Sequence, residues 1–280
     1  MLWRDCGKDW ENKMTVPEYE AFAVKYGERM GKRGQIFIGG DPHDAPLAMD
    51  YFVWAVRNSE RTVVLDIGYG KAEGERRGRT FLRCPTEGLK LIGIDAETVE
   101  DVVISHMHYD HVGNLEKFPN ARFHIQDADL AYVTGRAMTH KPLRHSFVLA
   151  DVQEMVAAVY GDRVQFHDGD DDLYPGITLH HIPGHTRGLQ SMRVNTKRGP
   201  VVLASDAAHY FESLTDERPF MTHENIYLML EGYRHLKKLA PTSDHSVPGH
   251  DPLVMQRYPA PTPELAGIVA RLDVAPTPAG

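Results

Sequence analysis

The hydrophobic pattern of the first quarter of the chain is that of strands separated by turns. Apolar residues dominate the runs 35–38, 49–56 and 62–66, and a Gly-Gly-Asp-Pro turn at 39–42 separates the first two. Short apolar runs bounded by glycine, proline and polar residues are typical of β-strands. We therefore predict that hairpins open a sheet in this region.

The second half of the chain mixes short strand-like runs with one clear helix. Residues 177–182, 201–204 and 243–247 favour strands, and each run leads into a turn. Residues 224–240 instead carry apolar side chains at steps of three and four residues, which predicts a helix with one face packed on a sheet. Its apolar face consists of Ile226, Met229, Leu230, Tyr233, Leu236 and Ala240.

Three histidines and one aspartate follow directly after the apolar run 101–104. They form an H-x-H-x-D-H pattern: His106, His108, Asp110 and His111. A strand end is a rigid place from which to aim ligands, and a mixed His/Asp set without cysteine suits a hydrolytic metal centre better than a structural one. The alternative, a solvated histidine-rich loop, explains this spacing poorly.

Three further candidate ligands stand at turns after predicted strands. His185 lies in Pro-Gly-His-Thr, Asp206 in Ala-Ser-Asp-Ala and His250 in Pro-Gly-His-Asp. Ligands at successive strand ends can converge on one edge of a sheet. The sequence therefore indicates one metal centre built from distant segments.

The combined order H-x-H-x-D-H, His, Asp, His resembles the metallo-β-lactamase superfamily from about Asp41 to Tyr258. The resemblance implies an α/β fold, the αββα sandwich, with a dinuclear metal site at the edge of the two sheets. It also implies two divalent ions per chain, with Zn²⁺ favoured and Fe, Mn or Co as alternatives. By the family's pattern His106, His108 and His185 hold the first metal, Asp110, His111 and His250 the second, and Asp206 bridges both.

The turn that begins at Asp66 resembles a second element of the family. Residues 66–70 match its strand-end D-x-G pattern, whose aspartate orients the metal loop by hydrogen bonds. Without the family, Asp66 is an ordinary strand-end residue.

The resemblance implies hydrolysis by a hydroxide that bridges the two metals. Five neutral imidazoles and two carboxylates leave two divalent ions with a net positive charge, and metal binding lowers the pKa of water from about 15.7 to near 7. Asp110 is expected to pass a proton to the leaving oxygen.

Within the superfamily the chain most resembles the N-acyl-homoserine lactonase group, through residues 206–220 with their D-E-x-P-F ending. This implies a lactonase whose substrate is an N-acyl-homoserine lactone, in which case it would quench quorum sensing, or another small lactone or ester. The group places a carbonyl-binding tyrosine three residues after the bridging aspartate. Here that position is His209, and the tyrosine is Tyr210, so both are candidates for this contact.

Two other classes of function remain open. One is another hydrolase of the superfamily, acting on a small ester, thioester, phosphodiester or β-lactam. The other is a non-hydrolytic metal protein, either a metal-dependent binding protein or a di-iron redox module, although no flavin domain for the latter is recognisable.

Other polar clusters carry weaker signals. His140 and His145 lie in the irregular stretch 135–149, which could be a binding loop, but lack a neighbouring ligand and are interpreted as surface or packing residues. The acids of 168–172 lack calcium-loop spacing and indicate a solvated turn. His180 and His181 are not needed for the metal count.

Length and ligand spacing indicate one domain. The chain has 280 residues, 42% of them apolar, and dividing it between 106 and 250 would divide the site. We expect a single domain over 1–280, with a core at about 34–258, an N-terminal extension at 1–33 and a proline-rich C-terminal arm at 259–280.

Net charge and cysteine content limit which partners the protein is expected to bind and in which cellular compartment it is expected to lie. A net charge of −8 with interspersed signs argues against nucleic-acid binding. The partner that the resemblance implies is a small-molecule lactone or ester. No apolar segment suits a signal peptide or a membrane span, and Cys6 and Cys84 form no C-x-x-C pair. We expect a cytoplasmic protein, and a homodimer is left open.

Overall fold

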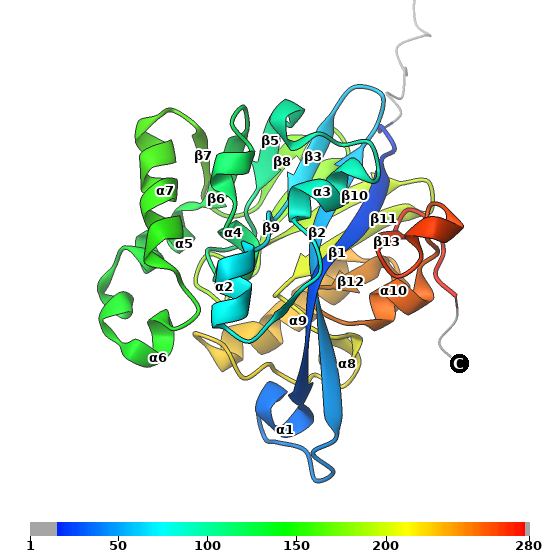
Figure 1. Cartoon of the computed structure of the whole chain (residues 1–280). Coiled ribbons are helices and arrows are strands. Elements are labelled where there is room, and N and C mark those ends of the chain that lie inside the picture. The colour runs from blue at the N-terminus through cyan, green and yellow to red at the C-terminus, as the bar shows by residue number, and fades with distance from the viewer. Residues whose placement is uncertain (1–15, 278–280) are drawn as a thin grey trace, which may run out of the picture.

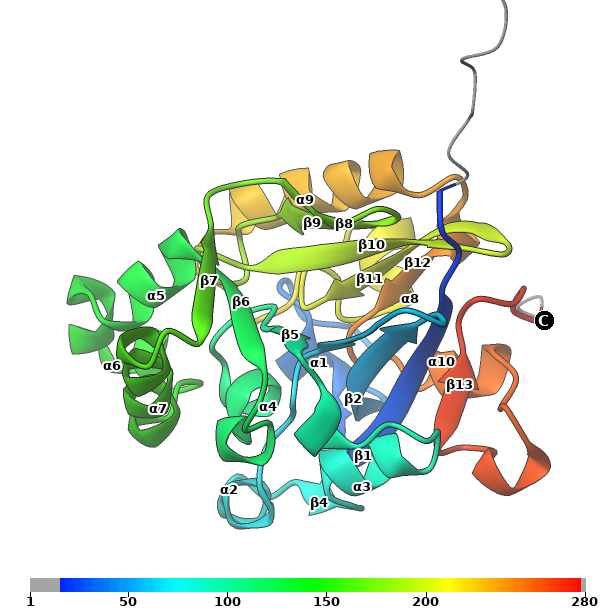
Figure 2. The same cartoon turned by 90° about the horizontal axis from the view of Figure 1, so that it is seen from above.

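The computed structural model describes residues 16–277, so Cys6 lies outside the described residues. Two sheets pack face to face with helices on their outer faces, which confirms the predicted αββα sandwich (Figures 1 and 2). In Figure 2, α9 (Ile226–Leu239) covers the second sheet, while α2 (Lys71–Arg76) and α3 (Pro85–Lys90) lie beyond the first.

The first sheet has the order β13-β1-β2-β3-β5-β6-β7, and β4 also pairs with β1. Its strands are β1 (Glu20–Lys32), β2 (Pro46–Arg57), β3 (Thr62–Leu65), β4 (Thr80–Phe81), β5 (Asp101–Val103), β6 (Arg122–Gln126), β7 (Val164–His167) and β13 (Val269–Arg271). The second sheet has the order β12-β11-β10-β9-β8. Its strands are β8 (Asp171–Tyr174), β9 (Ile177–His181), β10 (Gln190–Thr196), β11 (Gly199–Ser205) and β12 (Ser246–Pro248).

The remaining helices are short. They are α1 (Arg33–Ile36), α4 (Tyr109–Val112), α5 (Asp127–Val133), α6 (Lys141–Arg144), α7 (Leu149–Tyr160), α8 (Phe211–Thr215) and α10 (Leu253–Arg257). Single 3-10 turns are η1 (Ala96–Thr98), η2 (Leu115–Lys117), η3 (Arg136–Thr139), η4 (Ser243–His245) and η5 (Pro263–Leu265). None of the helices within residues 16–277 combines the length and apolar character that a membrane crossing needs.

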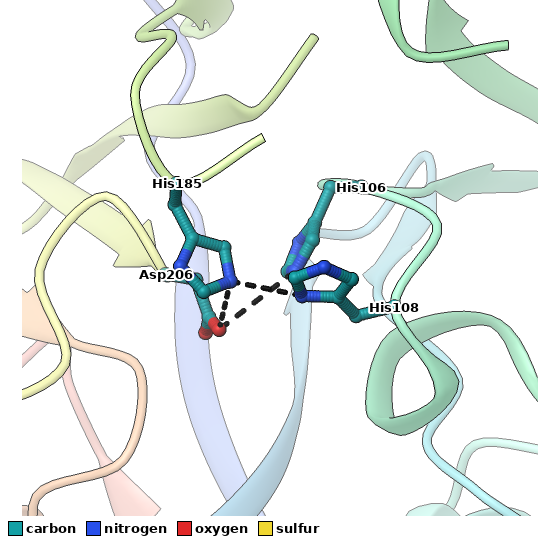
Figure 3. Close-up of side chains that lie close together, drawn as sticks. All are labelled: His106, His108, His185 and Asp206. Atoms are coloured by element: carbon teal, nitrogen blue, oxygen red, sulfur yellow. Dashed lines mark hydrogen bonds and ion pairs between the residues drawn. The ribbon is translucent and has the colours of Figure 1, made fainter. Parts of the chain in front are cut away.

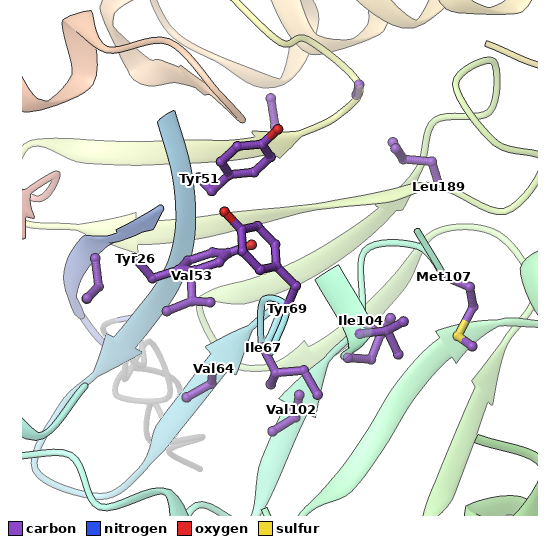
Figure 4. Packing of buried hydrophobic residues seen from close by; sticks show 14 of the residues in the cluster. Tyr26, Tyr51, Val53, Val64, Ile67, Tyr69, Val102, Ile104, Met107 and Leu189 are labelled. Carbon is purple, nitrogen blue, oxygen red and sulfur yellow. The ribbon is translucent and has the colours of Figure 1, made fainter. Parts of the chain in front are cut away.

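Alternation along β2 shows how the sequence builds two apolar layers. Phe52 and Trp54 point into the layer between the sheets, whereas Tyr51 and Val53 face the helices on the other side. The Tyr51 ring packs there against the rings of Tyr26 and Tyr69 (Figure 4). The Tyr69 ring is edge-on to that of Tyr51, with the ring centroids 5.3 Å apart. Because both faces are covered, β2 is apolar at nearly every position.

Parallel pairing brings the candidate ligands together. Strand β3 is parallel to β5, so their carboxyl ends place Asp66 beside Ser105. Strand β11 is parallel to β12, which places Asp206 beside His250. The chain thus delivers polar side chains from both sheets to one edge of the sandwich.

The predicted boundaries of the core were too narrow. Strand β1 lies inside the first sheet, between β2 and β13, although its residues were assigned to an N-terminal extension. Strand β13 belongs to the predicted C-terminal arm, yet its Arg271 pairs with Phe22 of β1. Charged side chains obscure the strand pattern in β1, and at least one of them, Lys25, is neutralised by Asp50 of β2 at 2.8 Å.

Two predicted strands differ from the structure, whereas the clearest helix was confirmed. The run 243–247 is a strand only at its end, because η4 covers Ser243–His245 and β12 begins at Ser246. Residues 35–38 do not form a strand: α1 ends at Ile36, and Phe37 makes only an isolated bridge with Phe220. The helix predicted at 224–240 is α9, which is capped by the Asn225 side chain at its start.

Candidate metal centre

The structure brings all seven predicted ligands to the edge of the two sheets. The H-x-H-x-D-H residues lie on the loop after β5 and on α4, and the other three follow β9, β11 and β12. Each of the seven is buried, and Asp110 is the most exposed at 7%. The burial excludes the alternative of a solvated histidine-rich loop.

Four of these residues form a first group, shown in Figure 3. One ligand atom from each of His106, His108, His185 and Asp206 lies within 4.8 Å of all the others. The Nε2 atom of His185 is 2.9 Å from His108 Nδ1 and 3.0 Å from Asp206 Oδ2, and His106 Nε2 is 3.7 Å from the same oxygen.

The second group is formed by Asp110, His111 and His250, again within 4.8 Å. The other oxygen of Asp206 faces this group: Oδ1 lies 2.8 Å from His250 Nε2 and 3.3 Å from His111 Nε2. The two oxygens of one carboxylate therefore face two separate sets of donors. This arrangement can bridge two cations.

The donor atoms fit divalent metal ions. Among the described residues, His106 Nε2, His111 Nε2 and Asp206 Oδ1 are buried without a hydrogen-bond partner. Buried polar atoms normally have partners, since leaving them unpaired is costly. A cation in each group would satisfy these atoms, and imidazole with carboxylate suits divalent first-row metals.

Burial and nearby charges set the protonation of the ligands. Burial lowers the pKa of His106 and of His108 well below the usual range, so both imidazoles are neutral and can bind a metal. Burial opposes ionisation of Asp206, but the surrounding histidines, His250 foremost, hold its pKa well below the usual value. The Asp206 side chain is therefore an anion.

Asp66 orients the metal loop, as the resemblance implied. Its carboxylate accepts hydrogen bonds from the Ser105 amide at 2.7 Å and the Ser105 hydroxyl at 2.8 Å, and it lies 2.7 Å from His111 Nδ1. Nδ1 of His185 and of His250 likewise donates to the carbonyls of Thr222 and Asp50. These contacts leave Nε2 of each ring free to face the centre.

Asp129 is a positioning residue that the sequence did not reveal. Its buried carboxylate accepts from the Met107 amide at 2.7 Å and from the Thr186 hydroxyl at 2.7 Å. It therefore ties the loop of His106 and His108 to the loop of His185. A Cβ at Gly188 would lie 2.2 Å from the Asp129 amide nitrogen, so this approach requires glycine. Only tertiary contacts show this role.

His209 and Tyr210 have different surroundings. The His209 ring stacks on Phe220 with centroids 3.5 Å apart, and its Nε2 lies 3.0 Å from Asp206 Oδ2 without hydrogen-bond geometry. Burial lowers the pKa of His209 to about 3. The hydroxyl of Tyr210 instead donates to the Ala48 carbonyl at 3.2 Å. Tyr210 lies outside the cavity lining, so we withdraw it as a substrate contact.

A cavity of about 150 Å³ opens onto the centre. It is lined by His209 and by members of both predicted metal groups, namely His108, His185, Asp206, Asp110 and His250. His145 also lines this cavity, although the sequence indicated only a surface or packing role. A second hollow, of about 380 Å³, shares His108, His145 and His185 with the first. Its apolar wall is formed by Tyr132, Pro142, Leu143, Phe147 and Met221.

The other polar clusters lie away from the centre. The Asp168–Asp172 stretch contains the start of β8, and its Asp170 and Asp171 bond His180 and His167 rather than forming a calcium loop. His181 Nε2 lies 2.9 Å from the carbonyl oxygen of Arg187.

Comparison with known proteins agrees with this geometry. The family model of the Metallo-beta-lactamase superfamily matches residues 49–257. An N-acyl homoserine lactonase of Bacillus sp is 30% identical over 154 residues, which cover 54% of this chain and 55% of that protein. Acyl-coenzyme A thioesterase MBLAC2 of Homo sapiens is 27% identical over 191 residues, 60% of this chain and 61% of the relative. The chain thus spans little more than half the length of these curated relatives.

A solved structure has the same fold over a longer span. N-acyl homoserine lactone hydrolase, with the product N-hexanoyl-L-homoserine bound at its catalytic metal centre, superposes with a TM-score of 0.70. The match covers 85% of this chain and 94% of the other at 21% identity. At 21% sequence identity, this structural similarity shows a shared fold and nothing further.

We predict that Asp66→Asn weakens metal binding about ten- to a hundredfold, because one amide oxygen cannot replace both carboxylate oxygens: Oδ1 accepts from the Ser105 amide, and Oδ2 lies beside His111 Nδ1. Asn tolerates the left-handed backbone at this position, where φ is 61°, so the fold is retained. Competition with a chromogenic chelator measures the affinity. Asp172→Asn, at an exposed acid, is the matched control; equal affinities for the two variants would contradict the orienting role.

Proposed function

The chain belongs to the metallo-β-lactamase superfamily, and we propose that it is a metal-dependent hydrolase that opens the ring of a small lactone. The observation that carries the proposal is the Asp206 carboxylate, whose two oxygens face two groups of buried donors next to a cavity. The lactonase relative and the lactonase-like segment at 206–220 support the ester bond of a lactone as the bond that is hydrolysed.

Two divalent cations, proposed to be Zn²⁺, would supply a hydroxide at neutral pH and polarise the scissile carbonyl. Ring opening consumes one water: oxygen adds to the carbonyl carbon, the bond to the ring oxygen breaks, and that oxygen takes up a proton. Asp110 borders the cavity beside His111 and His250, and we assign it as the group that delivers this proton. The new carboxylic acid then ionises.

His209 is proposed to donate a hydrogen bond to the substrate carbonyl. Its lowered pKa keeps the imidazole neutral at pH 7, and a neutral ring has one N–H to donate. Both ring nitrogens lack a hydrogen-bond partner within the described chain. Stacking on Phe220 fixes the plane of the ring at the cavity wall.

The second, more apolar hollow gives space for a hydrocarbon arm of the substrate. It begins at His108 and His185 of the first ligand group and continues along Leu143 and Phe147. Burial of such an arm would contribute about 25 cal/mol per Å² of apolar surface. This space suits a lactone larger than the bare ring.

A second candidate function is thioester hydrolysis. It is favoured by one of the relatives, an acyl-coenzyme A thioesterase. The same water addition serves either bond, because both substrates present an acyl carbon to the centre. A cytoplasmic location is proposed from the low cysteine content of the chain.

We predict that the metal-loaded protein opens lactones faster than it hydrolyses thioesters, phosphodiesters or β-lactams. The panel should contain N-acyl-homoserine lactones, other γ-lactones, an acyl-coenzyme A, bis(p-nitrophenyl) phosphate and nitrocefin. Proton release, followed with a pH indicator, measures the opening of lactones. Absorbance changes measure the hydrolysis of the thioester, the phosphodiester and the β-lactam. Turnover confined to the thioester would refute the lactonase and establish the second candidate.

We predict that His209→Ala lowers turnover of the preferred lactone about ten- to thirtyfold, a loss of about 1–2 kcal/mol of transition-state stabilisation. His209→Tyr should recover much of it, because the phenol also donates. Metal content must be equal in all variants. Tyr210→Phe, which removes a hydroxyl bonded to Ala48, is the matched control. A normal rate in His209→Ala would remove the donor role.

A further inference from the structure

Three arginines line the cavity that opens onto the metal centre. Arg29 comes from β1, and Arg77 and Arg79 come from the segment between α2 and β4. The chain as a whole carries a net charge of −8, so this concentration of positive charge is local. Among residues 16–277, the acids that line the cavity are Asp110 and Asp206, and both belong to the predicted ligand set.

Arg77 already has a carboxylate partner, Glu73, which it shares with Arg76. Its guanidinium pairs with Glu73 and lies over the Tyr109 ring, 4.0 Å from the ring centroid. Arg77 therefore serves mainly to hold the cavity wall. Its backbone carbonyl accepts a hydrogen bond from Arg79 Nη1 at 2.9 Å.

Arg29 and Arg79 have no carboxylate partner. Arg79 Nε donates to the Tyr109 hydroxyl at 3.1 Å, and Arg29 Nε contacts Met49 Sδ at 3.3 Å. Within residues 16–277, neither guanidinium has an acidic side chain within ion-pairing distance. Both arginines are only partly exposed, and a partly buried cation without a counter-ion is unfavourable.

The same wall is continuous with the second ligand group. The Tyr109 hydroxyl donates to the Tyr51 hydroxyl at 3.3 Å, and the Tyr51 ring packs edge-on against His250 with centroids 5.2 Å apart. An anion held between Arg29 and Arg79 would therefore lie next to the second group. The apolar hollow opens instead from His108 and His185 of the first group.

We propose that the substrate is a lactone that carries a carboxylate, and that Arg29 and Arg79 bind this carboxylate. This inference rests on the lactonase function proposed above and selects the class of lactone. A planar guanidinium presents N–H groups that match the two oxygens of a carboxylate. An uncharged lactone, such as an N-acyl-homoserine lactone, would leave both positive charges uncompensated and is the poorer substrate.

The reaction adds one water across the ring C–O bond of such a lactone. Its product has a hydroxyl in place of the ring oxygen and a second carboxylate, after release of one proton. The arginines therefore contact an anion before and after ring opening, so binding of the ring-opened product reports on the same site.

Steady-state kinetics on two matched lactones test the proposal. The probes are paraconate, a γ-lactone whose ring carries a carboxylate, and its uncharged carboxamide. We expect the wild type to favour paraconate in kcat/KM by about ten- to a hundredfold, the range for hydrogen bonds to a charged group. In Arg29→Gln and Arg79→Gln this ratio should fall at least about tenfold, mainly through KM, and Arg79→Lys should recover part of it.

The matched control is Arg76→Gln, which removes the same charge from a neighbouring, solvent-exposed guanidinium outside the cavity lining. It should keep the wild-type ratio. A wild-type ratio near one would overturn the proposal, and so would a ratio that Arg29→Gln and Arg79→Gln leave unchanged.

Calorimetry separates this inference from the lactonase function. The ring-opened dicarboxylate and its monoamide are titrated into the metal-loaded wild type and Arg79→Gln. We expect the wild type to prefer the dicarboxylate about tenfold or more and Arg79→Gln to lose that preference. If the wild type opens neither these two lactones nor any lactone of the panel above, the proposed function fails. Calorimetry then decides on the arginine site alone: equal affinities of the wild type for the two ligands overturn it.

Discussion

The carboxylate of Asp206 is buried among imidazoles that come from both sheets, and this interaction organises the active edge of the molecule. Its Oδ2 faces His106 and His185, and its Oδ1 faces His111 and His250. A buried anion is unfavourable unless cations or donors compensate it. Two cations, as proposed above, would fulfil that condition and would also satisfy the ring nitrogens of His106 and His111, which lack partners among the described residues.

The fold supplies this arrangement through strand ends. Parallel pairing of β3 with β5 and of β11 with β12 places polar turns side by side, while the apolar residues of the same strands fill the layer between the sheets. Two buried carboxylates then fix the loops: Asp66 holds Ser105 and His111, and Asp129 joins Met107 to Thr186. The strands that fill the apolar layer therefore also carry the loops that position the candidate ligands.

The cluster of candidate ligands was predictable because four of its residues are local in sequence and the rest follow apolar runs at turns. The αββα fold and the orienting role of Asp66 came from the family resemblance, since an aspartate at a strand end carries no signal by itself. Strand β1, Asp129 and His145 were missed because their roles arise from contacts between segments far apart in the chain. Arg29 and Arg79 are recognisable only once the cavity shows them without acidic partners.

The most direct test of this account is the metal content of the purified protein, measured by elemental analysis together with turnover of its preferred lactone. The bridging position of Asp206 between two groups of donors predicts two divalent ions per chain in the fully active protein. Removal of the ions with a chelator should abolish turnover, and their return should restore it. Full activity with one ion per chain, or with none, would contradict the dinuclear centre.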